Sequence, residues 1–156
     1  MTERLWAPWR LEYIQGADEG GRACIFCDPG EELLVHRGER AAVLLNKYPY
    51  ASGHLLVAPL RHVGSYGELE DEEALELHRL ARAGIEALTA VYRPEGFNIG
   101  WNLGRIAGAA IAEHVHQHIV PRWAGDTNFM PVLADVKVLP EHLTETRRRL
   151  VEAWPA

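Results

Sequence analysis

Three histidines alternate with other residues over five positions of the chain, at His114, His116 and His118. Side chains at every second position of an extended strand point to the same face, so this spacing predicts three imidazoles on one face. Imidazole transfers protons, attacks electrophiles and binds metals near neutral pH. Because burying three of these polar rings without partners is costly, we expect the cluster to serve a site.

Three interpretations of the histidine cluster differ in what the imidazoles do. A polar strand that faces solvent would give them no task, which is uncommon for three imidazoles at this spacing. A single metal ion held by all three is disfavoured, because the first and last imidazoles on one strand lie about 13 Å apart, too far to share an ion. In the third interpretation, one imidazole acts as a nucleophile while its neighbours position a phosphate.

A second set of reactive side chains is the pair Cys24 and Cys27, the two cysteines of the chain. A disulfide between residues this close would close only a small loop, so the spacing indicates metal binding or redox chemistry. A redox pair of this spacing usually follows a strand and opens a helix. Glycines precede Cys24, and Asp-Pro-Gly follows at 28–30, which favours neither element.

The strands that must position the histidines follow from hydrophobic patterning. Residues 32–46 predict two short strands around a turn at Gly38, and residues 54–60 form a short apolar run bounded by turn residues. Residues 97–104 and 113–123 alternate between apolar and polar side chains, and the histidines lie in the second of these stretches.

Residues 70–92 carry the clearest helical pattern. Their first turns are acidic, and Pro94 with Gly96 would end the helix. One face collects small and apolar residues at helical spacing, namely Leu77, Ala81, Gly84, Leu88 and Val91. A second, C-terminal helix is expected over 140–153. Strands on both sides of one long helix predict an α+β domain with a largely antiparallel sheet.

Length and charge narrow the classes of function. The chain of 156 residues fits one domain, which we place at 1–156, with an N-terminal arm at 1–30 that carries the cysteine pair. Its net charge of −6 argues against a general nucleic-acid-binding protein. We find no apolar stretch of the roughly 20 residues that span a bilayer and no targeting segment. We therefore expect a cytoplasmic protein without a membrane partner.

These motifs resemble a known family. The sequence HVHQHIV at 114–120 matches the pattern His-x-His-x-His, followed by apolar residues, of the histidine triad (HIT) family. The segment at 44–63 looks like the family's nucleotide-binding strand-loop-strand, and the segments at 4–14, 96–109 and 121–140 are similar to its diadenosine polyphosphate (Ap4A) phosphorylase-like branch. The resemblance covers nearly the whole chain and implies a HIT-like fold whose antiparallel sheet extends across a homodimer.

The resemblance also implies roles for single residues. The middle histidine, His116, would attack the α-phosphorus of a nucleotide and form a nucleotidyl-histidine intermediate. His118 would donate to a phosphate oxygen, and Asn102 occupies the position of an amide that contacts phosphate. Asn46 stands where relatives contact the ribose hydroxyls. His54 belongs to the family's Gly-His pair, and we expect it either to have a structural role or to support the residues that contact the substrate.

The chain departs from the family just before the histidines. Many histidine triad hydrolases carry a Gln and a Ser or Thr there that bind phosphate, whereas this chain has Ala109 and Ala110. Backbone N–H groups of the loop 107–110 would then bind the phosphate instead. The departure leaves open whether water or phosphate accepts the nucleotidyl group.

Relatives that carry a Cys-x-x-Cys pair hold a structural zinc ion between these cysteines and two histidines. The matching residues here are Cys24, Cys27, His62 and His114, a complete Cys2His2 set. Zinc would give His114 a partner and would attach the N-terminal arm to the sheet. The alternative is that the two cysteines bind no metal and remain free thiols. The sequence does not decide whether a divalent ion accompanies the substrate.

We therefore expect an enzyme that transfers or hydrolyses a nucleotidyl group at the α-phosphate of diadenosine polyphosphates, with adenosine nucleotides as its partners. A nucleoside phosphoramidate or dinucleoside polyphosphate hydrolase is an alternative that would use the same nucleophile. A nucleotide-binding sensor without turnover is an alternative of another class. Such a sensor would keep Asn46 and the zinc set but would need no reactive imidazole at His116.

Overall fold

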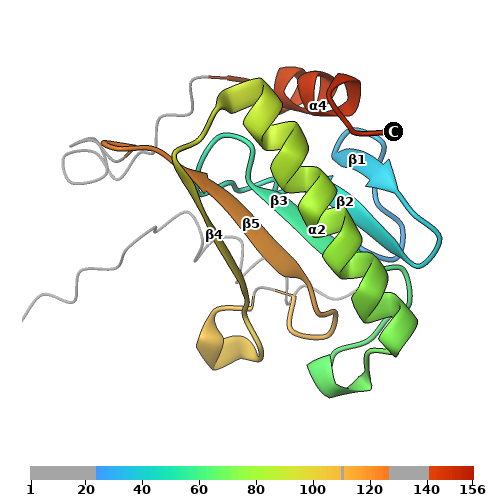
Figure 1. Ribbon diagram of the computed structural model, residues 1–156. Coiled ribbons are helices and arrows are strands. Elements are labelled where there is room, and N and C mark those ends of the chain that lie inside the picture. Colours follow the sequence, from blue (N-terminus) through green and yellow to red (C-terminus); the bar gives the residue numbers. More distant parts are fainter. Residues whose placement is uncertain (1–23, 110, 127–140) are drawn as a thin grey trace, which may run out of the picture.

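The computed structural model describes residues 24–109, 111–126 and 141–156. Within these ranges, five strands form one antiparallel sheet in the order β1-β2-β3-β5-β4 (Figure 1). The strands are β1 (Leu34–Arg37), β2 (Ala41–Leu45), β3 (Leu55–Pro59), β4 (Gly96–Trp101) and β5 (Gln117–Arg122). The predicted α+β class with an antiparallel sheet is confirmed.

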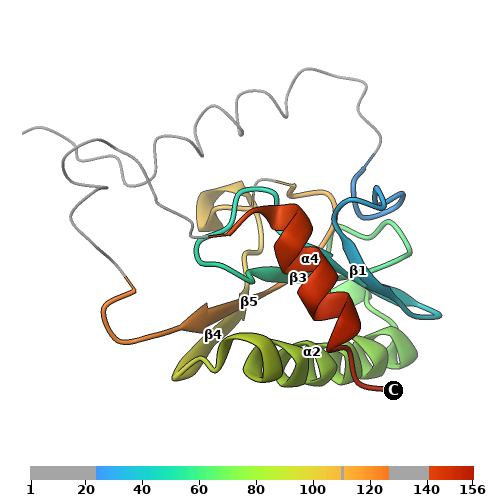
Figure 2. The same ribbon diagram turned by 90° about the horizontal axis from the view of Figure 1, so that it is seen from above.

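Two α-helices pack on this sheet. Helix α2 (Asp71–Tyr92) lies across one face and contacts β2, β3 and β5, while α4 (Leu143–Glu152) packs against β1 and α2 (Figure 1 and Figure 2). Two short 3₁₀ helices, η1 and η2, cover Tyr66–Glu68 and Arg105–Ala107. Among the helices of the described ranges, none combines the length and the apolar character needed to cross a membrane.

The central strands β2 and β3 are buried on both faces of the sheet, which explains their continuous apolar sequences. Val43 and Leu55 belong to the core under α2, whereas Leu44 and Leu56 belong to a smaller cluster on the opposite face. Leu56 lies opposite His118 in the register of β3 and β5. His118 therefore points to the face of the sheet that α2 does not cover.

Helix α2 follows the sequence pattern. At its start, the side chains of Glu70 and Glu73 each accept a hydrogen bond from the backbone N–H of the other residue, which is a capping box. At its end, Arg93 adopts a left-handed conformation directly before Pro94. The predicted apolar face packs on the sheet, with Val91 only partly buried. The long helix is thus confirmed.

The strand predicted over 113–123 is shorter than expected. β5 begins only at Gln117, so the first two histidines of the cluster precede the strand instead of lying in it. The pairing of β5 with both neighbours stops at Gln117, which lies opposite Val57 of β3 and opposite Trp101, the last residue of β4. The segment before β5 bonds elsewhere, since the N–H of Val115 donates to the carbonyl of Val63 at 2.8 Å.

The remaining predicted elements differ from the structure only at their ends. β3 and β4 end one and three residues before the predicted stretches 54–60 and 97–104 do, and the C-terminal helix begins at Leu143. Its predicted start at 140 lies outside the described residues. So do most of the N-terminal arm, the family-like segment at 4–14 and the greater part of the segment at 121–140.

Gly53, directly before His54, is required by both conformation and space. Its φ is 81°, and a Cβ atom there would lie 2.6 Å from Cδ2 of Leu88. We expect Gly53→Ala to lower the free energy of unfolding by about 1–3 kcal/mol, because the backbone is strained and the core is overpacked. Gly96→Ala is the control, since a Cβ there meets nothing within 4 Å. Equal urea midpoints for the two variants would contradict this prediction.

Candidate active site and metal centre

The four predicted metal ligands come together beside the C-terminal end of β3. Their ligand atoms all lie within 4.8 Å of one another. Sγ of Cys24 lies 3.3 Å from Nδ1 of His114, and Sγ of Cys27 lies 3.2 Å from Nδ1 of His62 and 3.6 Å from Nδ1 of His114. Tetrahedral zinc with bonds of about 2.0–2.3 Å places neighbouring ligands about 3.3–3.8 Å apart. The donor set therefore fits a four-coordinate metal ion.

His114 is held in the orientation that a metal ligand needs. Its Nε2 donates to the carbonyl of Pro59 at 2.8 Å, which leaves the lone pair of Nδ1 toward the two thiols. The ring is completely buried, and burial lowers the pKa of His114, although the bond to Pro59 opposes this shift. The neutral imidazole, which is the form that binds metal, is thereby favoured.

The loop that carries His62 is tied to helix α2 by the preceding residue. Arg61 donates to both carboxylate oxygens of Glu73, at 2.9 and 2.7 Å, and to the carbonyl of Glu68 at 2.7 Å. The Glu73 side chain is almost fully buried, so this ion pair fixes the loop against the first turn of the helix. The position of His62 therefore depends on the packing of α2.

Phe26 joins the metal centre to the catalytic candidate. It lies between the two cysteines in the sequence, and its ring is 1% exposed. The ring stacks on the imidazole of His116, with centroids 4.7 Å apart and an interplanar angle of 26°. It also contacts His114, at 5.1 Å between centroids. A metal ion that orders residues 24–27, the cysteine turn, would thus also hold Phe26 against His116.

His116 has a defined tautomer in its neutral form. Its Nδ1 lies 2.8 Å from the carbonyl of His114, and because a carbonyl can only accept, Nδ1 carries the proton. The lone pair then resides on Nε2. The side chain is buried, and burial lowers the pKa of His116, with the bond to His114 acting in the opposite direction. The geometry is that of an imidazole prepared to attack through Nε2.

His118 is oriented by His54, which is completely buried. The backbone N–H of Tyr50 donates to Nδ1 of His54 at 3.1 Å, so this nitrogen is an acceptor and the His54 proton resides on Nε2. Nε2 of His54 lies 2.9 Å from Nδ1 of His118. His118 therefore accepts at Nδ1 and carries its own N–H on Nε2. The imidazoles of His116 and His118 are 5.0 Å apart between centroids.

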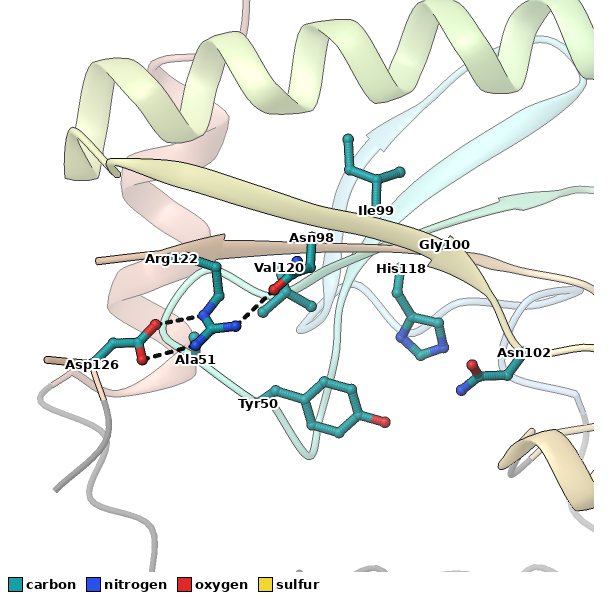
Figure 3. A pocket seen from close by; sticks show the side chains of 10 residues that line it. All are labelled: Tyr50, Ala51, Asn98, Ile99, Gly100, Asn102, His118, Val120, Arg122 and Asp126. Atoms are coloured by element: carbon teal, nitrogen blue, oxygen red, sulfur yellow. Dashed lines mark hydrogen bonds and ion pairs between the residues drawn. The ribbon is translucent and has the colours of Figure 1, made fainter. Parts of the chain in front are cut away.

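A pocket of about 410 Å³ opens beside His118 on the face of β4 and β5 that α2 does not cover. Figure 3 shows His118 and Asn102 at one end, Arg122 with Asp126 at the other, and the ring of Tyr50 between them. The predicted phosphate-contacting pair, His118 and Asn102, is thus brought together. Nδ2 of Asn102 makes a long bond of 3.5 Å within its own loop, to the carbonyl of Gly108.

The predicted ribose residue, Asn46, is engaged in its own loop. Its Oδ1 accepts the backbone N–H of Tyr48 at 2.9 Å, and its Nδ2 lies 3.3 Å from Nδ1 of His54. The side chain therefore orders the 46–54 loop and is linked to His118 through His54. Its contact with a ribose stays a prediction.

The loop before the histidines has fewer backbone N–H groups available to a phosphate than predicted. The backbone N–H groups at 107–109 donate to the carbonyls of Gly104 and Arg105 within η2, at 2.9 to 3.3 Å. Phosphate binding at Ala109 would require one of these bonds to open. Ala110 lies outside the described residues, so its predicted contact stays a prediction.

Sequence reasoning missed two contributors to the site, Phe26 and Arg122, and left the role of a third, His54, open, although each gave a signal. Phe26 lies between two predicted ligands, so a metal-bound turn must carry its ring to the sheet. His54 was expected to be structural or to support a residue of the site, and its contact with His118 depends on the pairing of β3 with β5. Arg122 lies four positions after His118 on β5, and the two-residue period of a strand puts both on one face.

An antiparallel sheet with one long helix on one face and an alternating histidine cluster on the other defines the histidine triad class of proteins. The chain belongs to the HIT domain family, whose model matches residues 31–125. The predicted family is therefore confirmed.

Similar proteins include enzymes and a solved nucleotide-binding protein. The AP-4-A phosphorylase of Mycobacterium tuberculosis is 40% identical over 99% of this chain and 85% of its own length. The adenosine 5'-monophosphoramidase of Schizosaccharomyces pombe is 36% identical over 64% of this chain and 74% of its own. The structure of a hypothetical histidine triad nucleotide-binding protein from Sulfolobus tokodaii matches with a TM-score of 0.69 and 27% identity, covering 83% of this chain and 91% of that one. The HIT-like fold is confirmed.

Proposed function

We propose that this protein transfers a nucleotidyl group from diadenosine polyphosphates through a covalent intermediate on His116. The observation that carries the proposal is the tautomer of His116, because Nδ1 donates to a backbone carbonyl and the lone pair of Nε2 is left for attack. The similarity to a mycobacterial AP-4-A phosphorylase over nearly the whole chain supports this class of substrate.

The reaction proceeds in two displacements at one phosphorus. Nε2 of His116 attacks the α-phosphorus of diadenosine tetraphosphate, the bond to the bridging oxygen breaks, and ATP leaves. Inorganic phosphate then attacks the adenylyl-histidine and releases ADP, whereas attack by water releases AMP. The relative named as a phosphorylase favours phosphate as the acceptor.

His118 and Asn102 are proposed to bind the phosphate oxygens during both displacements. The tautomer imposed by His54 puts the His118 proton on Nε2, and the Asn102 amide supplies a second donor at the same end of the pocket. Donors fixed in advance stabilise the negative charge that grows on these oxygens in the transition state. The N–H of Ala109 contributes only if its bond to the carbonyl of Gly104 opens, and a contact from Ala110 stays a prediction.

The direct test of this function is product analysis with and without phosphate. Incubation of diadenosine tetraphosphate with the protein is expected to give equal amounts of ADP and ATP when phosphate is present. AMP with ATP would identify water as the acceptor and the protein as a hydrolase. Tight binding without any product would instead support the non-catalytic sensor and contradict the proposal. Parallel reactions with and without magnesium determine whether a divalent ion accompanies the substrate.

A nucleoside phosphoramidate hydrolase is the second candidate, favoured by the similarity to the fission-yeast adenosine 5'-monophosphoramidase. It would use the same attack by His116, with an amine as the leaving group in place of a nucleotide. The ratio of kcat/KM for adenosine phosphoramidate and diadenosine tetraphosphate separates the two functions. A higher value for the phosphoramidate would make hydrolysis of that bond the main activity.

For the centre formed by Cys24, Cys27, His62 and His114, we propose zinc in a structural role. Two thiols and two imidazoles are the donors that zinc prefers, and four protein ligands leave no coordination site for a substrate. A centre of this kind needs reduced thiols, which supports a cytoplasmic location. The ion would anchor the last residues of the N-terminal arm in a single domain.

The orientation of His118 by His54 gives a prediction for catalysis. We expect His54→Ala to lower kcat for diadenosine tetraphosphate by roughly tenfold or more, the effect of losing about 1.4 kcal/mol of transition-state stabilisation. In a His118→Ala background the same substitution should have little further effect. His78→Ala, an exposed histidine on α2, is the matched control. Additive losses in the double variant would exclude this role for His54.

We also propose a homodimer formed along β4. This strand lies at the edge of the sheet, and its Ile99 side chain is 47% exposed. An edge strand with an exposed apolar residue is suited to pairing with a second copy, which would extend the sheet. Light scattering at micromolar concentration is expected to give the mass of a dimer, and a monomer would exclude this arrangement.

A further inference from the structure

The pocket between β4 and β5 extends well beyond the proposed phosphate contacts. It begins at His118 and Asn102 and reaches Arg122, four residues further along β5 (Figure 3). Four residues of a strand correspond to about 13 Å, which is more than a single phosphate group needs. The sheet order puts β4 and β5, the strands under this pocket, on the opposite side of β3 from β2, after which Asn46 lies, and Tyr50 and Ala51 of the loop that carries Asn46 also line it. The pocket therefore has room for the part of the substrate that leaves.

The far end of the pocket carries a neutralised charge. The Arg122 guanidinium donates to both carboxylate oxygens of Asp126, at 2.6 and 3.0 Å, and to the side-chain oxygen of Asn98 at 2.7 Å. The Asp126 side chain is 15% exposed, so the ion pair is partly shielded from water. A chain that ends in a free phosphate carries several negative charges, and Asp126 would repel them. Hydroxyl groups or the edge of a base can bind the same ion pair without that cost.

Between its two ends, the pocket has an aromatic and apolar wall. The ring of Tyr50 lies nearly parallel to that of His118, with centroids 6.0 Å apart and an interplanar angle of 12°. Val120 lines the sheet side of the same space. An aromatic surface of this kind suits a sugar or a planar base better than a phosphate. The Arg122–Asp126 ion pair at the far end and the Tyr50 ring in the middle therefore both favour a nucleoside as the occupant of the pocket.

We propose that the β4–β5 pocket binds the departing nucleoside of a dinucleoside polyphosphate, and that the Arg122–Asp126 pair selects chains capped by a nucleoside over chains with a free phosphate end. The inference rests on the proposed function for the identity of the substrate. It adds the subsite that distinguishes a dinucleotide from a mononucleotide.

Two ligands test the selection directly, because they differ only in the cap. Diadenosine tetraphosphate and adenosine 5'-tetraphosphate present the same adenosine and the same α-phosphate, but only the first carries a second nucleoside. We would measure both dissociation constants by calorimetry on the His116→Ala protein, which removes the proposed nucleophile and keeps the pocket. The capped ligand is expected to bind about tenfold more tightly, the effect of one or two additional polar contacts.

Variants of the pocket should move this ratio in a defined way. Asp126→Asn leaves the Arg122 charge uncompensated, so the free phosphate end should gain affinity and the ratio should fall about tenfold. Tyr50→Leu should lower the ratio by weakening the capped ligand alone. Glu145→Gln is the matched control, because it also removes a carboxylate from an arginine pair, with Arg148 on α4.

The outcomes separate this inference from the proposed function. Ratios that stay within twofold of the parent value in both Asp126→Asn and Tyr50→Leu would overturn the subsite. Because the readout is binding, the inference can hold even if the wild-type protein turns over neither ligand, an outcome that would overturn only the proposed function.

Discussion

Replacing His116 with alanine is expected to lower kcat for diadenosine tetraphosphate by roughly four orders of magnitude or more, because the covalent route through the nucleotidyl-histidine is lost. The other two histidines of the cluster have their lone pairs engaged elsewhere. Nδ1 of His118 faces His54, and Nδ1 of His114 faces the two thiols. His118→Ala should cost less, about a hundredfold to a thousandfold, since it removes a donor but keeps the nucleophile. Initial rates with purified variants measure both effects.

The folding of these variants must be checked separately from their activity, since His116 packs under Phe26. Circular dichroism and metal content report on the fold and on the neighbouring centre. His78→Ala, which replaces an exposed histidine far from the cluster in the sequence, should behave as the wild type. A His116→Ala protein that is folded, contains metal and retains more than about a hundredth of the wild-type kcat would contradict the role of His116 as nucleophile.

Removal of the metal is expected to have the largest effect on stability. The four ligands come from three separate segments, which are the cysteine turn, the loop after β3 and the residues before β5. Without the ion, Cys24 and Cys27 would no longer be held to the sheet, and burial of Phe26 alone would have to keep the turn in place. We expect chelation, or Cys27→Ser, to lower the free energy of unfolding by several kcal/mol. Thermal unfolding followed by circular dichroism, with metal content measured on the same samples, checks this.

Loss of the metal should also lower activity, because Phe26 links the metal centre to His116. If the cysteine turn detaches, the ring no longer covers His116, and kcat should fall together with stability. His142→Ala removes an exposed histidine outside the ligand set and serves as the control. Less than about half an equivalent of zinc in the purified protein, or an unfolding midpoint unaffected by chelator, would exclude the structural zinc.

That the histidine cluster would belong to a site could be anticipated from its spacing, but the backbone around it could not. Alternation predicted a strand over all three histidines, whereas β5 starts at Gln117, where its pairing with both β3 and β4 stops. That boundary depends on which strand pairs with β5 and in which register, and neither is encoded locally. The helix at Asp71–Tyr92, in contrast, was predictable because its caps and its apolar face lie within one segment.

The metal centre and the pocket differ in how far the sequence could reveal them. Cys24 and Cys27 are close in the sequence and indicated metal binding or redox chemistry, but the choice of metal and the addition of His62 and His114 came only through the family resemblance. Arg122 and Asn98 meet because the register of β4 and β5 sets Asn98 opposite Val120. Contacts of this kind follow from strand pairing, which the pattern of a single strand does not specify.

The covalent intermediate is the feature on which the proposed mechanism depends most. It can be trapped by mixing the wild-type protein with diadenosine tetraphosphate in the absence of phosphate, quenching within milliseconds, and mapping the modified peptide by mass spectrometry. We expect one adenylyl group per chain, attached to His116, which disappears with formation of ADP when phosphate is added. Turnover without any adduct, or an adduct on a residue other than His116, would contradict the mechanism.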